Sequence, residues 1–183
     1  MDSTHPELLR RPDSSEYFHY YDTYVRLVPD GRCLELLHGQ VDTLKIVFSL
    51  VSDKEAMQVH PPYQWTIKQV VGHLIDTERV FADRMHRFAS GETQPQTGMD
   101  QDLYVTHHDY DAPLLQSLVD ELILCRQANI MLIGRLQPAA WDRQGQASAH
   151  KVSVRALIWM MVGHVIHHLK IVQKRLVRPV NSL

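Results

Sequence analysis

Four long stretches of this sequence carry apolar residues at the three- and four-residue spacing of an α-helix. The clearest covers residues 66–90, where Thr66 and Gln69 fit a capping box at the start and Gly91 is a typical stop. Its apolar stripe consists of Ile67, Val70, Val71, Leu74, Phe81, Met85 and Phe88. Because each such helix must bury its stripe against another element, this periodicity predicts a helical bundle.

The other three stretches show the same pattern. Residues 30–52 and 113–136 carry leucines, valines and isoleucines at helical spacing, and Pro113 suits the first turn of the second stretch. The last stretch runs from Ser153, a favourable N-cap, to about Leu176. No strong alternating strand pattern accompanies them. The predicted fold class is therefore all-α, a four-helix bundle with an extra short N-terminal helix.

The predicted domain boundary lies at Pro29. Residues 1–29 are expected to form an N-terminal leader, either mobile or strapped across the surface, with a short helix over residues 16–28 that ends before the proline. Residues 30–178 are expected to form the bundle. Within it, residues 90–112 make a connection long enough to be functional or to pack as its own unit.

Charge and cysteine content narrow the function classes. The net charge is -2 and the 19 basic residues are scattered, which disfavours nucleic acid and anionic membrane surfaces as partners. The two cysteines lack CxxC spacing, the N-terminus has no apolar signal region, and no stretch approaches the roughly 20 apolar residues that span a bilayer. These features predict a reduced, cytoplasmic protein.

Histidine is enriched, with 12 in the chain. His164 and His168 stand four apart in the last helix, so both imidazoles share one face and could bind one metal ion. His167 lies about 100° further round, toward solvent. His73 sits at the border of the buried stripe of the 66–90 helix. The three imidazoles would leave coordination positions open for water or substrate, as catalytic sites do; the alternative for each is a partly buried histidine without a ligand role.

Other polar residues could complete such a site. Asp76 lies one turn from His73 and could orient its ring, and Glu78 is a second candidate base. The more common outcome for both is a solvent-facing carboxylate. The 90–112 connection could close over the metal or be an ordinary polar loop. Its polar side chains are Asp100, Asp102, Tyr104, His107 and His108. No catalytic residue is assigned from the sequence.

Four segments in combination resemble the DinB/YfiT-like superfamily: YQWTIKQVVGHLIDTERVFADRMHRFASGE, MDQDLYV, AAWDR and WMMVGHVIHHLKIVQ. The resemblance spans roughly residues 30–176. It implies a four-helix bundle that holds a divalent metal, zinc or nickel, on His73, His164 and His168.

The same resemblance implies a function and an assembly. It implies a homodimeric metal-dependent enzyme, either a transferase that uses a metal-activated low-molecular-weight thiol or a hydrolase, acting on a small electrophilic substrate. The alternative is a non-catalytic, metal-binding stress-response bundle. A fourth protein ligand would favour that alternative, because structural zinc normally takes four.

Overall fold

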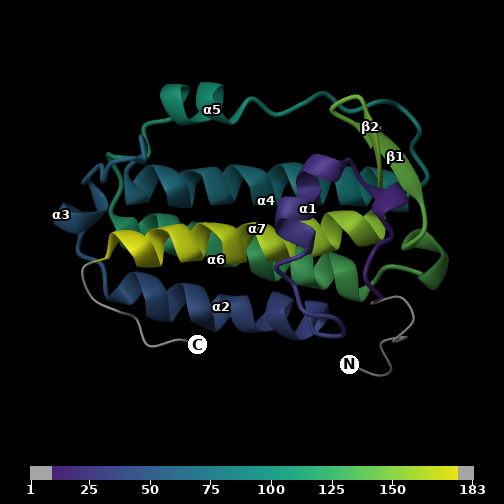
Figure 1. Cartoon of the computed structure of the whole chain (residues 1–183), viewed down its shortest axis with the longest axis horizontal. Coiled ribbons are helices and arrows are strands. Elements are labelled where there is room, and N and C mark those ends of the chain that lie inside the picture. Colours follow the sequence, from purple (N-terminus) through teal and green to yellow (C-terminus); the bar gives the residue numbers. More distant parts are fainter. Residues whose placement is uncertain (1–9, 177–183) are drawn as a thin grey trace.

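A computed structural model describes residues 10–176, and these form a bundle of four long helices (Figure 1). The long helices are α2 (Cys33–Ser49), α4 (Ile67–Ala89), α6 (Leu115–Gly134) and α7 (Val154–Arg175). Both α2 and α4 pack against α6 and α7, so that α6 and α7 lie between them (Figure 1). The all-α, four-helix prediction is confirmed. None of the helices in the described range is long and apolar enough to cross a membrane.

The helix starts follow local capping chemistry. The Thr66 hydroxyl accepts a hydrogen bond from the Gln69 amide at 3.0 Å, and the Gln69 side chain accepts one from the Thr66 amide at 2.9 Å. Ser153 caps α7 as predicted. The prediction for Pro113 is wrong, because α6 begins two residues later, at Leu115. The Leu115 amide donates a hydrogen bond at 2.9 Å to the carboxylate of Asp53, the first residue of α3 (Asp53–Ala56).

Two apolar clusters fill the bundle, and a buried polar layer separates them. Arg126, which is fully buried, donates hydrogen bonds to Glu78 at 2.5 Å and to Gln40 at 2.7 Å. Asn129 donates to the other Glu78 oxygen at 2.8 Å, and Gln40 donates to the carbonyl of Val162 at 2.8 Å. This layer links all four long helices at one level. Every charged member has a partner, as burial requires.

The N-terminal segment, residues 10–32, is a strap across the bundle. The helix predicted over 16–28 is shorter than expected: 3-10 turns at Ser14–Glu16 and His19–Tyr21 lead into α1 (Asp22–Val25), which packs against α7. The predicted leader residues 1–9, and residues 177–178 of the predicted bundle domain, lie outside the described residues.

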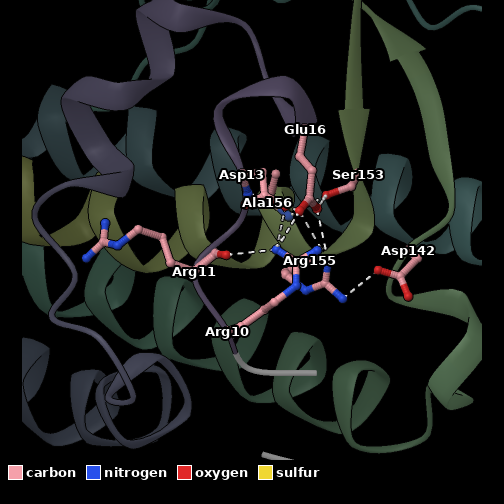
Figure 2. Close-up of polar contacts among 8 residues, drawn as sticks. All are labelled: Arg10, Arg11, Asp13, Glu16, Asp142, Ser153, Arg155 and Ala156. Carbon is pink, nitrogen blue, oxygen red and sulfur yellow. Dashed lines mark hydrogen bonds and ion pairs between the residues drawn. The ribbon is translucent and has the colours of Figure 1, made fainter. Parts of the chain in front are cut away.

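Buried Glu16 fastens this strap to the bundle (Figure 2). Its carboxylate accepts hydrogen bonds from the Ser153 hydroxyl at 2.6 Å and from Arg155 at 3.1 Å. Arg155 also donates to Asp142 at 2.6 Å (Figure 2). The strap is therefore tied to the first turn of α7 by charge-assisted hydrogen bonds.

Two connections hold structure that the periodicity did not predict. The stretch before α7 contains an antiparallel hairpin of β1 (Gln144–Ala147) and β2 (His150–Ser153). Its turn has positive φ values at Ser148 and Ala149, 51° and 66°, where glycine or asparagine would have signalled a hairpin. In the 90–112 connection, Asp100 caps α5 (Gln101–His107), which lies above α4 (Figure 1).

Candidate metal centre

Three histidine side chains converge in the interior between α4 and α7. The Nε2 atom of His164 lies 3.1 Å from Nε2 of His73 and 3.0 Å from Nε2 of His168. The three nitrogens all lie within 4.8 Å of one another. The residues are only 4%, 5% and 9% exposed for His73, His164 and His168. The bundle thus brings together the border residue of one helix and the i, i+4 pair of its neighbour, the three histidines singled out in the sequence.

The chemistry of these nitrogens suits a cation better than a chain of hydrogen bonds. A ring nitrogen offers one in-plane site, either an N–H or a lone pair, so Nε2 of His164 cannot make good hydrogen bonds to both neighbours. Three lone pairs directed at one cation satisfy every ring. Nitrogens that bind one zinc ion tetrahedrally at about 2.0–2.1 Å lie roughly 3.3 Å apart, within a few tenths of an ångström of the two contacts seen here. The triad could therefore hold a metal ion.

Burial keeps these imidazoles neutral at physiological pH. It lowers the pKa of His73 to about 4. Burial also lowers the pKa of His164 and of His168 well below the usual range, and the neighbouring rings reinforce that effect. The neutral imidazole is the form that binds metal, so no proton has to be displaced.

Within the described residues, the Nδ1 nitrogens of two of these rings lack the hydrogen bond that usually orients a metal-binding histidine. Nδ1 of His73 and Nδ1 of His168 are buried and have no hydrogen-bond partner among residues 10–176. The prediction that Asp76 orients the His73 ring is wrong, because this carboxylate instead accepts a hydrogen bond from the Tyr110 hydroxyl at 2.5 Å. The Tyr110 ring can approach α4 because Gly72 has no side chain; a Cβ there would lie 2.3 Å from the ring.

Glu78 is also placed differently from either sequence-based expectation. It points into the polar layer, where it pairs with Arg126, and contributes no atom to the histidine cluster. Asp76 and Glu78 are 5% and 3% exposed, so the solvent-facing alternative fails for both. Their partners lie 34 and 48 residues away in the sequence, beyond the reach of helical spacing.

The remaining candidates lie around the triad or away from it. His167 is half-buried rather than solvent-facing, because α1 covers it, with 5.4 Å between its ring and that of Tyr24. It is not part of the cluster. Of the residues in the 90–112 connection, Asp102 borders a cavity at His168. A separate surface hollow is lined by Tyr104, His107 and His108.

Two cavities border the triad. The first, of about 230 Å³, is lined by His73 and His164, and the second, of about 250 Å³, by His168. Gln101 at the start of α5 lines both, so the 90–112 connection does border the site. We call the first the strap cavity, because the strap supplies Tyr20, Tyr21 and Tyr24 to its wall.

Sequence reasoning missed several of the residues that shape the strap cavity. Arg84 of α4 and the three strap tyrosines were not singled out. The dense run of aromatic residues from Tyr17 to Tyr24 was a signal for the strap contribution, since aromatic clusters outside a periodic helix often mark a contact surface. Nothing in the local sequence around Arg84 marks it as lining a cavity.

Comparison with known proteins fixes the family. The sequence model of the DinB superfamily matches residues 36–172. The chain belongs to the DinB superfamily. The match leaves out the strap, residues 10–32. No significantly similar sequence was found among curated proteins.

Solved structures of the same fold include two informative relatives of this DinB-superfamily protein. YfiT from Bacillus subtilis, described as a probable metal-dependent hydrolase with an unusual four-helix bundle topology, has a TM-score of 0.69 and 16% identity; the match covers 92% of this chain and 95% of that chain. A mycothiol-dependent maleylpyruvate isomerase has a TM-score of 0.66 and 15% identity. That match covers 80% of this chain and 61% of the isomerase. At such identities the likeness shows a shared fold.

Proposed function

We propose that this protein is a metal-dependent enzyme in which His73, His164 and His168 hold one divalent ion, zinc or nickel. The observation that carries the proposal is the convergence of three buried, neutral imidazoles, with Nε2 contacts of 3.0 and 3.1 Å. Three protein ligands leave coordination positions open for a reactant. The description of YfiT as a probable metal-dependent hydrolase supports this class of activity.

The reaction we favour is transfer of a low-molecular-weight thiol to a small electrophile. A divalent ion at the triad would lower the pKa of a coordinated thiol or water, so that a nucleophile is available near neutral pH. Two separate cavities border the triad, one at His73 and His164 and the other at His168, which suits a two-substrate transfer better than hydrolysis. The mycothiol dependence of the isomerase with the same fold supports a thiol, and YfiT keeps a hydrolase as the second candidate.

The cysteines of the chain suggest a reducing compartment, which suits chemistry with a low-molecular-weight thiol. Cys33 and Cys125 are both free thiols, and Cys33 is buried. Free cysteines are typical of reducing compartments, where low-molecular-weight thiols also stay reduced. We therefore propose that the enzyme works in the cytoplasm.

The coordination number separates the enzyme from a non-catalytic metal-binding bundle. Within the part of the chain that the structure describes, no fourth histidine, cysteine or carboxylate joins the triad. A structural zinc ion would normally have such a ligand. The three-residue set therefore favours the catalytic alternative.

Metal analysis of the purified protein tests the ligand assignment. We expect about one divalent ion per chain in the wild type and loss of most of it in His164→Ala and in His168→Ala. His167→Ala is the matched control, because this imidazole neighbours the triad without joining it. Unchanged metal content in both ligand variants, or loss of metal in the control, would contradict the assignment.

An activity screen tests the reaction class. The metal-loaded protein is offered a generic aromatic electrophile with each of several low-molecular-weight thiols, and separately a set of activated esters. Thiol-dependent consumption of the electrophile that disappears in His164→Ala supports the transferase, and ester cleavage without thiol supports the hydrolase. A metal-loaded protein inactive in both assays would support the non-catalytic bundle.

A further inference from the structure

The strap cavity contains one charged side chain whose charge the protein leaves unbalanced. Arg84 is 6% exposed, and its Nη2 atom donates to the Thr97 carbonyl at 2.8 Å and lies 3.5 Å from the Ser148 hydroxyl. Both of these partners are neutral. Among residues 10–176 no carboxylate forms an ion pair with Arg84.

Two other buried arginines have carboxylate partners. Arg126 pairs with Glu78, and Arg155 pairs with Glu16 and with Asp142. Buried Arg175 instead lies over the Tyr63 ring and donates to the Trp65 carbonyl. A buried guanidinium without a counter-ion costs free energy. The neighbouring acid on α4, Asp83, forms no ion pair with Arg84 and pairs instead with half-buried Arg87. Arg84 is thus buried at a cost in free energy, which an anionic ligand bound to its guanidinium would offset.

The remaining wall of the strap cavity does not supply an anion either. The described residues that line it include no aspartate or glutamate. Tyrosine hydroxyls, Gln101 and Ser148 provide neutral polar groups, and Phe81 provides an apolar surface. Among the described lining residues, Arg84 is the one arginine, lysine, aspartate or glutamate, and its single positive charge matches a carboxylate.

The spacing along α4 places this charge in line with the triad. His73, Thr77, Phe81 and Arg84 all line the cavity, and their spacings of four, four and three residues put them on one face of the helix. Helical side chains lean toward the N-terminus, so Arg84 leans toward His73. A molecule lying along this face meets the guanidinium at one end and the triad at the other.

We propose that the strap cavity binds a small carboxylic acid, with its carboxylate on the Arg84 guanidinium and its other end toward the histidine triad. A planar guanidinium fork matches a carboxylate in shape and charge. The cavity, about 230 Å³, lies below the range of roughly 300–1,000 Å³ of sites for drug-sized ligands, so the acid is small. That this acid is the electrophilic substrate rests on the proposed function; that the cavity binds it does not.

Binding of simple probes to the metal-free protein tests the proposal without relying on metal or activity. Benzoate, its neutral counterpart benzamide, and phenylphosphonate are titrated into EDTA-treated protein and followed by calorimetry. We expect benzoate to bind at least tenfold more tightly than benzamide. Arg84→Met should abolish that preference, and Arg84→Lys should restore part of it.

The control is Arg87→Met on the same helix, which removes a half-buried arginine paired with Asp83 and Glu92 and should keep the full preference. Circular dichroism establishes that each variant is folded. No measurable benzoate binding, equal binding of benzoate and benzamide, or a preference that survives Arg84→Met would overturn the proposal. Tighter binding of phenylphosphonate than of benzoate would replace the carboxylate with a phosphoryl group and so overturn the assigned class. The metal assignment is tested separately, because metal content is measured without any of these acids.

Discussion

Each imidazole of the candidate metal centre loses its hydration on burial in the bundle interior. Because this loss disfavours the charged form, the pKa of His73 falls to about 4, and the pKa values of His164 and His168 are also lowered. The histidines are thus neutral ligands in the folded protein, and their burial reduces its stability only at acidic pH.

The metal-free protein should lose stability as the pH falls below about 6.5. In the unfolded chain His73 takes up a proton near its ordinary pKa, whereas in the folded protein it does so only near 4. The unfolded state therefore binds more protons between these values, and the free energy of unfolding falls by up to about 1.4 kcal/mol per pH unit for this one group.

Urea unfolding of the metal-free protein between pH 7 and pH 5 measures this effect. His73→Gln should reduce the slope of stability against pH, since it removes one of the titrating groups. His86→Gln, at an exposed histidine of the same helix, is the control and should leave the slope close to wild type. Equal slopes in the wild type and in His73→Gln would show that His73 is not held neutral by folding.

Gly163, next to His164, should not tolerate a side chain. A Cβ at this position would lie 2.2 Å from the backbone oxygen of Tyr24, so alanine would push the strap away from α7. We expect Gly163→Ala to destabilise the protein by about 1–3 kcal/mol in chemical unfolding. Gly39→Ala in α2 is the matched control, because nothing lies within 4 Å of its Cβ and the helix should gain about 0.5–1 kcal/mol. Similar effects of the two changes would contradict the close approach.

Between helices, the polar layer distinguishes this bundle from one held together by apolar contact alone. Gln40, Glu78, Arg126 and Asn129 come from three helices and join at the level where the two apolar clusters meet. An ion pair at this depth adds little net stability, but it penalises any arrangement of the helices that separates the charges. The layer therefore helps to set the register between helices, which the position of the triad also depends on.

Breaking the buried pair should cost far more than breaking a surface pair between the same helices. Arg126→Met leaves the Glu78 carboxylate buried without its partner, and we expect a loss of about 3–5 kcal/mol in the free energy of unfolding. The control is Arg79→Met, which removes the exposed ion pair between Arg79 and Glu121 and should cost no more than about 1 kcal/mol. Comparable losses in the two variants would refute the structural role assigned to the layer.

On the scale of the whole molecule, the outer faces of α2 and α6 carry apolar side chains that the bundle does not cover. Leu124 and Met131, seven residues apart on α6, are 66% and 72% exposed. Ile46 on neighbouring α2 is 49% exposed, and Leu50, directly after the end of α2, is 52% exposed. Uncovered apolar groups on adjacent helices are typical of a surface that joins subunits. We therefore propose that this surface joins two copies of the chain in the homodimer that the family resemblance implies.

Light scattering coupled to size-exclusion chromatography tests this assembly. We expect the wild type to elute with the mass of a dimer and the double variant Leu124→Glu, Met131→Glu to elute as a folded monomer. Leu103→Glu changes an exposed leucine of α5 and should leave the dimer intact. A wild-type protein that is monomeric at every concentration would contradict the expected homodimer.

Local chemistry was enough for much of this structure. The four helices follow from a repeat of 3.6 residues, and the caps at Thr66 and Ser153 follow from contacts within one turn. The pairing of His164 with His168 is equally local, because a four-residue spacing stacks two side chains on one face whatever the rest of the fold does. His73 was reached from its border position and from the family resemblance together.

Tertiary packing alone decided which polar groups meet. The Asp76 carboxylate joins Tyr110 rather than His73, Glu78 joins Arg126 across 48 residues, and Arg84 is left without an acid beside the triad. No spacing in the sequence encodes these outcomes, because each depends on which helix faces become neighbours and on how closely two backbones approach. A helical sequence specifies the directions of its side chains; the partners of those side chains exist only once the helices have packed.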